Sequence, residues 1–193
     1  MAELALLRHG HTSWNREGRL QGRRDIPLDD EARHALSALQ LPADWADADL
    51  VSSPLKRACE TAAIVAGRAP VPVAPLIEMD WGDWEGKSGR DLREDPKSGY
   101  TDIEHWGWSM QPPGGEALSD VRDRVVPWAM ALTRRTIAVC HIGIMRVLLA
   151  HAFDWDFTGT PPFAVKRNRL YVLEPAAGGL TRGGKIVPLE AAC

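Results

Sequence analysis

Short, mostly apolar runs alternate along the chain with stretches whose apolar residues recur every three or four positions. The runs LALLR and TIAVC have almost no polar positions, which is typical of strands covered on both faces in a parallel sheet. The run VPVAPLIE contains prolines, which favour an edge strand or an irregular segment. The expected strands are residues 3–8, 49–52, 71–78, 136–141, 169–175 and 185–190.

Helical spacing is found between these strands. Residues 30–40 carry Ala32 and Leu36 four positions apart, as expected for one buried helix face. A longer helix is expected over 116–134, interrupted by Pro127, because proline removes a backbone donor and clashes with the preceding turn. Shorter patterns predict a helix that opens directly after His141 and a weak one near residues 88–94.

The helix expected after strand 49–52 has the strongest local signals. Ser53 is the predicted N-cap, Pro54 suits the first helical position and Gly67 suits the end of the helix. Apolar residues then recur at intervals of three and four, which predicts one buried stripe. The expected members of that stripe are Leu55, Ala58, Cys59, Ala62 and Ala66.

Alternating strands and helices indicate an α/β fold. We expect a three-layer α/β/α sandwich around a mostly parallel central sheet, formed by a single domain over residues 1–193. Residues 79–115 differ from the rest of the chain in composition, because they are rich in Trp, Gly, Asp and Pro. We expect this region to be a small lid insertion, with its tryptophans packed against the sheet.

Composition and charge narrow the classes of partner. A formal charge of −3 and scattered Lys and Arg residues offer no basic stripe, so nucleic acid is not an expected partner. No apolar run approaches the roughly 20 residues that span a bilayer, so no membrane partner is expected. The three cysteines have no short spacing, and the N-terminus does not resemble a signal peptide. We therefore expect a cytoplasmic location.

Reactive side chains follow several of the predicted strands. Arg8 and His9 end the first strand, Arg57 falls in the first turn of the helix after strand 49–52, and His141 ends a later strand. Ligands of open α/β sheets bind at the carboxyl ends of the strands, where helix N-termini favour anions. The pattern predicts a pocket for a phosphate or a similar group.

Phosphoryl transfer would use these residue types. Arg8 and Arg57 can grip phosphate oxygens through paired donors, and a neutral imidazole is a competent nucleophile near pH 7. One of His9 and His141 could attack while the other stabilises the transferring group. A leaving alkoxide also needs a general acid. We expect Glu78 in that role because, among the carboxylates of IEMDWGDWEG, it alone directly follows a strand candidate.

The stretch LLRHGHTSWN resembles the Arg-His-Gly-x-Thr signature of the histidine phosphatase superfamily. RLQGRRDIPLDD, VSSPLKRACETA, IEMDWGDWEGKS, PPGGEALSDVRDRV and VCHIGIMRVLL follow in the family's order and spacing. The resemblance implies that His9 is the nucleophile and Glu78 the proton donor. It further implies that the phosphate pocket includes Arg8, Arg57, His141, Asn15 and the backbone N–H of Ile142. His11 and Gln21 are additional candidates for substrate contact.

The sequence departs from the family's usual pattern at a few positions. Ile142 stands where members often have Gly, which should keep a backbone N–H but narrow the pocket, and Ala117 stands where they often have Ser. Neither removes a proposed catalytic residue. Residues 11–24, 79–115 and 152–168 are expected to shape substrate preference.

The leading hypothesis is a phosphomonoester hydrolase that acts on a small phosphorylated metabolite and needs no metal or other cofactor. A cofactor-dependent phosphoglycerate mutase and an α-ribazole phosphatase are the nearest alternatives. A metal hydrolase using His9, His11 and His141 is disfavoured because nearby arginines repel a cation. A phospho-ligand binding module without turnover is disfavoured because binding alone requires no positioned acid. The oligomeric state is open.

Overall fold

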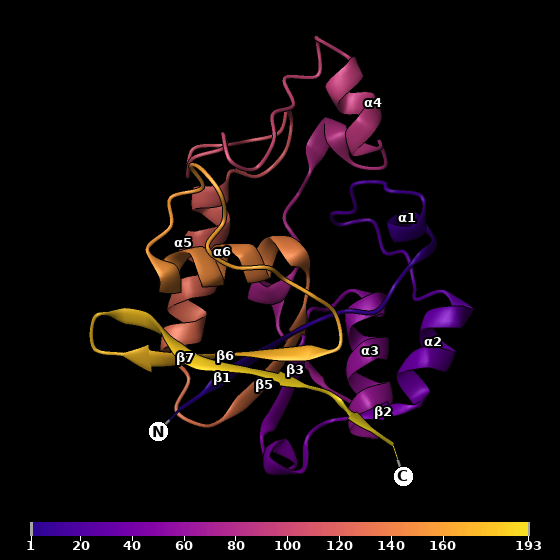
Figure 1. The fold of residues 1–193 in the computed structure, drawn as a ribbon, viewed down its shortest axis with the longest axis vertical. Helices are drawn as coiled ribbons and strands as arrows, with labels where there is room; N and C mark the ends of the chain where they lie inside the picture. The colour runs from indigo at the N-terminus through magenta and orange to yellow at the C-terminus, as the bar shows by residue number, and fades with distance from the viewer. Residues whose placement is uncertain (1, 193) are drawn as a thin grey trace.

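The computed structural model describes residues 2–192. Its main sheet has six strands in the order β4-β3-β5-β1-β6-β7, of which β4, β3, β5 and β1 are parallel and β6 and β7 antiparallel (Figure 1). A separate antiparallel pair joins β2 to β8. The strand bounds are β1 Leu4–Arg8, β2 Leu39–Gln40, β3 Asp49–Ser52, β4 Val71–Pro72, β5 Thr136–Cys140, β6 Arg169–Ala176, β7 Gly179–Pro188 and β8 Glu190–Ala191.

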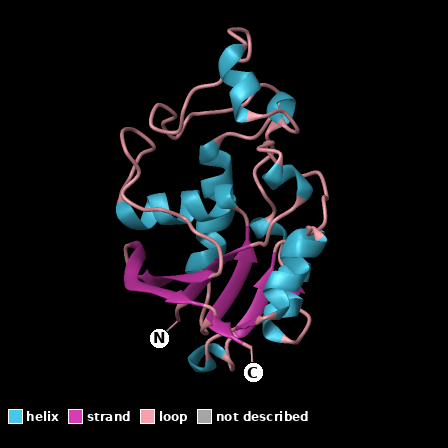
Figure 2. Ribbon diagram, turned by 45° about the vertical axis from the view of Figure 1, so that its right-hand side comes forward, coloured by secondary structure: helices cyan, strands magenta, loops and turns pink. Residues whose placement is uncertain are grey.

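Helices cover both faces of this sheet (Figure 2). In β1, Ala5 and Leu7 pack into one apolar cluster with α2 and α3, whereas Leu4 and Leu6 pack into a second cluster with α5 and α6. This two-sided burial is why β1 and β5 read as uninterrupted apolar runs. The predicted three-layer α/β/α sandwich is confirmed. The helices are α1 Ser13–Arg16, α2 Asp30–Ser37, α3 Lys56–Ala66, α4 Gly89–Glu94, α5 Leu118–Met130 and α6 Ile142–Phe153.

The register of the parallel strands brings their carboxyl ends to one edge of the sheet. Arg8 at the end of β1 pairs with Cys140 at the end of β5, and Ser52 at the end of β3 pairs with Val139. The chain continues from β5 directly into α6. The three segments expected to carry reactive groups therefore meet at this edge.

The start of α3 differs from the prediction. The helix begins at Lys56, with Leu55 as its N-cap residue, and Ser53 and Pro54 lie outside it. The backbone N–H of Lys56 instead donates to Asp25 Oδ1 at 2.7 Å. With this start the inward face consists of Arg57, Ala58, Thr61, Ala62 and Val65, whereas Cys59 and Ala66 are only half-buried.

Of two expectations based on proline, one is confirmed and one was wrong. Segment 71–78 is a short edge strand followed by irregular structure, as its prolines favour, whereas the helix that contains Pro127 is not interrupted. Only Val71–Pro72 of the expected strand 71–78 pairs with the sheet, and Ala74–Leu76 forms a 3₁₀ turn instead. Pro127 does not interrupt its helix, because α5 runs on to Met130. Residues 185–188 of the expected tail strand are the end of the longer β7, which returns from β6 through a tight turn at residues 177–178.

Residues 79–115 form an irregular extension at the end of the molecule opposite the sheet (Figure 1). It contains α4, where Ser88 caps the helix expected near 88–94, and short 3₁₀ turns. Trp81, Trp84 and Trp106 are buried and pack on one another, with ring centroids 5.8 and 6.4 Å apart. The same cluster continues into α5 and α6, so these tryptophans join the extension to the core. Its role as a lid stays a prediction.

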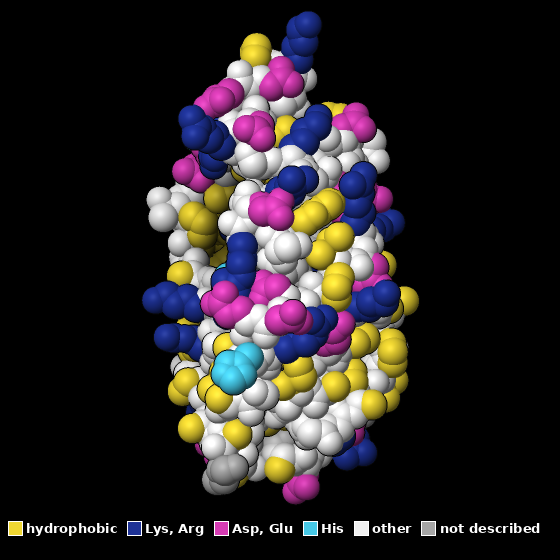
Figure 3. Space-filling view, turned by 90° about the vertical axis from the view of Figure 1, so that its right-hand side faces the viewer, with side chains coloured by type: hydrophobic (Ala, Val, Ile, Leu, Met, Phe, Trp, Pro, Cys, Tyr) yellow, Lys and Arg dark blue, Asp and Glu magenta, His cyan; other side chains and the backbone are white. Residues whose placement is uncertain are grey.

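Charges of both signs are interspersed on the face of the molecule shown in Figure 3. Ion pairs such as Arg16 with Asp29 and Arg33 with Glu60 connect neighbouring segments at the surface of the protein. Across residues 2–192, no helix is both long enough and apolar enough to cross a membrane.

Candidate active site

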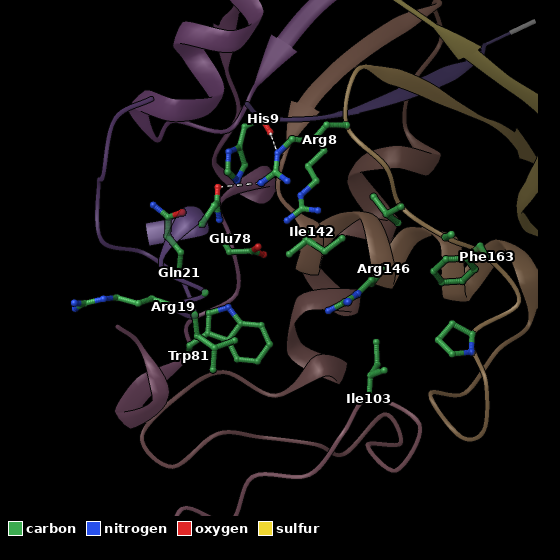
Figure 4. A pocket seen from close by; sticks show the side chains of 17 residues that line it. Arg8, His9, Arg19, Gln21, Glu78, Trp81, Ile103, Ile142, Arg146 and Phe163 are labelled. Atoms are coloured by element: carbon green, nitrogen blue, oxygen red, sulfur yellow. Dashed lines mark hydrogen bonds between the residues drawn. The ribbon is translucent and has the colours of Figure 1, made fainter. Parts of the chain in front are cut away.

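A cavity of about 430 Å³ opens at the carboxyl edge of the sheet (Figure 4). Its walls come from the end of β1, the loop around α1, the segment at Glu78, the start of α6 and residues 161–167. Arg8, His9, Asn15, Gln21, Glu78 and Ile142, all expected from the sequence, line it. His141 and Arg57 lie next to it but not on its wall, and His11 also does not line it.

His9 is held in one orientation by its backbone and its ring. Its N–H donates to Cys140 O at 3.0 Å, which joins the end of β1 to the end of β5. Its ring Nδ1 lies 2.6 Å from Gly10 O. A carbonyl oxygen only accepts, so Nδ1 must carry the proton and Nε2 must keep its lone pair. Burial, together with the charges of Arg57, Arg167 and Arg8, holds the pKa of His9 well below 6.5. The imidazole is therefore neutral.

His141 lies behind His9, with ring centroids 5.1 Å apart. Its Nδ1 accepts a hydrogen bond from Arg57 Nε at 3.2 Å, and its Nε2 is 2.7 Å from Ser53 Oγ. With Nδ1 as acceptor, Nε2 carries the proton and donates to Ser53. Burial and the charge of Arg57 lower the pKa of His141 well below 6.5, so this ring is neutral too. Ser53 thus orients a histidine instead of capping α3.

Arg57 is fully buried and its donors are engaged within the protein. Besides the bond to His141, its Nη1 donates to Arg24 O at 2.9 Å and its Nη2 to Gly22 O at 2.7 Å. Burial lowers its pKa to about 10, so it stays charged at neutral pH. The guanidinium ties the loop at residues 22–24 to His141, and Arg57 is not among the residues that line the cavity.

Arg8 differs because it faces the cavity without a partner. Within residues 2–192, its buried Nε has no hydrogen-bond partner and its guanidinium joins no ion pair. Burial and the nearby charge of Arg146 lower the pKa of Arg8. A partly desolvated cation of this kind attracts an anion.

Glu78 is the only acidic residue on the cavity wall within the described residues. Its Oε2 accepts from Gly143 N at 3.1 Å and its Oε1 from Met79 N at 2.9 Å, while burial raises the pKa of the carboxyl group. A Cβ on Gly143 would lie 2.4 Å from Glu78 Oε1, so any larger residue there would displace the Glu78 carboxyl group. The reason given from the sequence was wrong, since Glu78 follows a 3₁₀ turn and not a strand.

The neighbouring carboxylates are engaged in loop structure. Glu85 Oε1 accepts from the backbone of Gly22 and Arg24, and Asp80 Oδ1 accepts from Gly82 N. Neither residue lines the cavity. The structure thus separates Glu78 from the other carboxylates of the same turn.

The remaining expected residues have different surroundings. Gln21 lines the cavity, where its Oε1 accepts from Thr12 Oγ1 at 2.9 Å and its Nε2 is buried without a partner. Ile142 lines the cavity and begins α6, so its backbone N–H is one of the donors that a helix N-terminus leaves without an intrahelical partner. His11 is half-buried outside the wall, although its Nδ1 has no partner.

Three lining arginines were missed by the sequence analysis: Arg19, Arg146 and Arg167. Arg146 is one helical turn beyond Ile142, so the i,i+4 spacing within α6 could have identified it. Arg167 lies in an irregular segment whose side-chain directions leave no sequence signal. With Arg8, these residues give the cavity a strongly positive character against a single carboxyl group.

Within residues 2–192, no three His, Cys, Asp or Glu side chains are arranged to hold a metal ion. The site consists of a neutral histidine, arginine donors and one buried carboxyl group. That set can bind a tetrahedral anion, attack it and supply a proton.

Several known proteins are similar in sequence to this chain. The glucosyl-3-phosphoglycerate phosphatase of Mycolicibacterium vanbaalenii is 32% identical over an alignment of 166 residues, and the match covers 76% of this chain and 72% of that protein. A bifunctional protein of Mycobacterium tuberculosis is 33% identical over 168 residues, and the match spans 78% of this chain but only 44% of that longer protein.

A solved structure also resembles the whole chain. The crystal structure of phosphoglycerate mutase from Thermus thermophilus is similar with a TM-score of 0.74 at 30% identity, covering 99% of each chain. The family model described as histidine phosphatase superfamily (branch 1) matches residues 4–182. The chain therefore belongs to the histidine phosphatase superfamily.

Proposed function

We propose that this protein is a phosphomonoester hydrolase that works through a phosphorylated His9 and acts on a small phosphorylated metabolite. The observation that carries the proposal is the neutral His9 imidazole on the wall of an arginine-lined cavity. Its Nδ1 is bound to Gly10 O, and its Nε2 has no hydrogen-bond partner among residues 2–192. Membership of the histidine phosphatase superfamily supports the same chemistry.

In the first step, His9 Nε2 attacks the phosphorus atom and the bond between phosphorus and the leaving oxygen breaks. Arg8 stabilises the charge on the non-bridging oxygens, and the backbone N–H of Ile142 and the side chain of Asn15 supply further donors. Glu78 donates its proton to the leaving alkoxide, which its raised pKa makes possible.

In the second step, the Glu78 carboxylate takes a proton from water as the water oxygen attacks phosphorus. The phosphorus–nitrogen bond breaks and its electron pair returns to His9 Nε2, while inorganic phosphate leaves. Glu78 is then protonated again and His9 is neutral, so the site is ready for another cycle.

In this mechanism His141 and Arg57 do not line the cavity but keep His9 in place and unprotonated. His141 is 5.1 Å from His9 between ring centroids and is oriented by Ser53 and Arg57. The positive guanidinium of Arg57 disfavours protonation of both imidazoles. We assign Arg57 to keeping the histidines neutral and in place, and Arg8 to the phosphate itself.

A phosphoglycerate mutase is the second candidate. The similarity to the phosphoglycerate mutase structure from Thermus thermophilus favours it, and the similarity to the glucosyl-3-phosphoglycerate phosphatase favours hydrolysis. A hydrolase must admit water to the phosphohistidine, whereas a mutase must retain the reacting molecule. We keep hydrolysis as the proposal. A cytoplasmic location stays a separate prediction, which cell fractionation tests.

A substrate panel tests the proposal. Purified protein is assayed with 3-phosphoglycerate, α-ribazole phosphate, sugar phosphates and phosphoserine, with and without EDTA, while released phosphate and isomerised product are both measured. We expect phosphate release that EDTA does not reduce. Isomerisation of 3-phosphoglycerate far faster than its hydrolysis would identify a mutase, and loss of activity in EDTA would contradict the metal-independent mechanism.

A further inference from the structure

The segment between α6 and β6 forms one wall of the cavity. We call residues 160–168 the strap; residues 161 and 163–165 of the strap line the cavity together with Arg167. We propose that Arg167 is a positioning residue that holds the side chain of Asn15 in the orientation that binds the transferred phosphoryl group. This inference rests on the proposed phosphatase function.

Arg167 joins the strap to two parts of the opposite wall. Its Nε donates to His9 O at 3.1 Å, and its Nη2 donates to Asn15 Oδ1 at 3.0 Å. Figure 4 marks both hydrogen bonds with dashed lines. One planar guanidinium therefore fixes the backbone of the proposed nucleophile and a side chain from α1 at the same time.

These contacts determine which way the Asn15 amide points. Asn15 Oδ1 also lies 3.2 Å from the backbone N–H of Thr12. Two donors converge on this atom, so it must be the carbonyl oxygen, and the Asn15 NH₂ group points away from both donors. Asn15 lines the cavity, where its NH₂ group can donate to a phosphate oxygen. Without Arg167, the Thr12 bond alone would hold the amide.

The strap is itself held in place. Tyr171 is buried in β6, where its hydroxyl accepts from Lys166 N at 2.7 Å and donates to Ala164 O at 2.9 Å. These bonds fix the backbone immediately before Arg167.

The electrostatic surroundings of Arg167 are unfavourable. Within the described residues it has no ion-pair partner, and burial together with the charges of Arg8 and Arg16 lowers its pKa to about 10. Holding a cation beside other cations costs stability, which an anion bound in the cavity would offset.

A double-mutant cycle tests the inference. Arg167→Gln, Asn15→Ala and the double variant are compared with wild type for binding of inorganic phosphate by calorimetry and for kcat/KM on the best substrate of the panel. Because Arg167 acts through Asn15, each single change should reduce phosphate affinity and kcat/KM by about 10-fold to 100-fold. The double variant should lose clearly less than the product of the two single losses, although Arg167→Gln also removes one positive charge from the cavity wall.

Two further variants separate positioning from a general structural effect. Lys166→Gln alters the neighbouring strap residue, whose side chain faces a different cavity, and should leave both measurements unchanged. Arg167→Lys should restore only part of the loss, because an ammonium group cannot bond His9 O and Asn15 Oδ1 through a fixed fork. The acid limb of kcat/KM should also move to higher pH in Arg167→Gln, since one of the charges that disfavours a proton on His9 is removed.

The outcomes are distinct. Additive losses in the cycle, or an Arg167→Gln protein that binds phosphate as wild type does, would overturn the inference while hydrolysis by wild type still supports the proposed function. Absence of turnover in wild type would overturn the proposed function, and the phosphate-binding cycle would still decide the role of Arg167. A wild type that binds no phosphate would overturn the inference.

Discussion

Arg8 and Arg57 occupy equivalent places in the fold but have opposite surroundings. Arg8 ends β1 and Arg57 lies in the first turn of α3 after β3, so both are at the carboxyl edge of the sheet. Arg57 is fully buried and gives its donors to His141, Arg24 O and Gly22 O. Arg8 lines the cavity, and its buried Nε has no partner.

The difference teaches that the partners of a guanidinium, more than its place in the topology, decide what it can do. An arginine whose donors are satisfied by the protein is a structural cross-link, and its charge acts at a distance on neighbouring pKa values. An arginine with unpaired donors in a cavity raises the free energy of the empty site. A bound anion pairs with those donors and lowers that free energy again. We call residues of the first kind, such as Arg57, the holding layer of the site, and residues of the second kind, such as Arg8, the binding layer.

The largest expected effect on activity comes from a substitution in the binding layer. Arg8→Gln should reduce kcat/KM by about 10³-fold, because it removes a charged donor from the developing negative charge. Its thermal stability should be unchanged or higher, because a buried unpaired cation is removed. Steady-state kinetics and thermal denaturation check both parts. Full activity, or a large loss of stability, would place Arg8 in the holding layer instead.

The next largest effect is expected at Glu78, which also lines the cavity. Glu78→Gln should reduce hydrolysis of alkyl phosphates by about 10²-fold and affect p-nitrophenyl phosphate much less, because only the alkoxide needs a proton. In wild type the pKa of Glu78 is raised above 4.5, so activity on alkyl phosphates should fall as pH rises through that raised pKa. The variant should lack this basic limb. Equal losses for both leaving groups would show that Glu78 is not the acid.

Arg57 should show the reverse of Arg8. Arg57→Gln leaves the carbonyls of Gly22 and Arg24 and the Nδ1 of His141 without their donor, so the free energy of unfolding should fall by about 3 kcal/mol. Urea denaturation measures this change, with the exposed Arg90→Gln as a control of the same chemistry. A stable Arg57→Gln protein with greatly weakened phosphate binding would contradict the assignment.

The smallest expected effect is a shift in titration. Burial and the surrounding arginines lower the pKa of His9 and of His141, so both rings should stay neutral as the pH falls through 6.5 and gain a proton only well below it. NMR titration of the imidazole signals follows each ring, and Arg57→Gln should raise both pKa values. Titration of His9 near 6.5 in wild type would contradict the neutral nucleophile.

The sequence predicted well those features that depend on local pattern and strand order. The two-sided burial of β1 and β5 follows from their apolar runs, and parallel register then brings Arg8, His9 and His141 to one edge. Ser53 illustrates a limit, because its hydroxyl orients a distant histidine and leaves the helix start to other residues.

Contacts between distant segments could not be predicted in this way. Two partners of Arg57 come from a loop more than 30 residues earlier in the chain, and Arg167 meets His9 across 158 residues. Glu78 was identified correctly as a lining residue, but from a strand that the prolines prevent. Irregular segments carry little periodic signal, so their side chains become visible only in three dimensions.

The central claim is that His9 Nε2 carries the phosphoryl group. The most direct test is to quench wild type during turnover and to locate the bound phosphate by peptide mass spectrometry under alkaline conditions, with His9→Ala as the matched protein. The account predicts an acid-labile, alkali-stable phosphate on His9 and none in the variant. Phosphate on His11 or His141, or hydrolysis by His9→Ala at the rate of wild type, would contradict it.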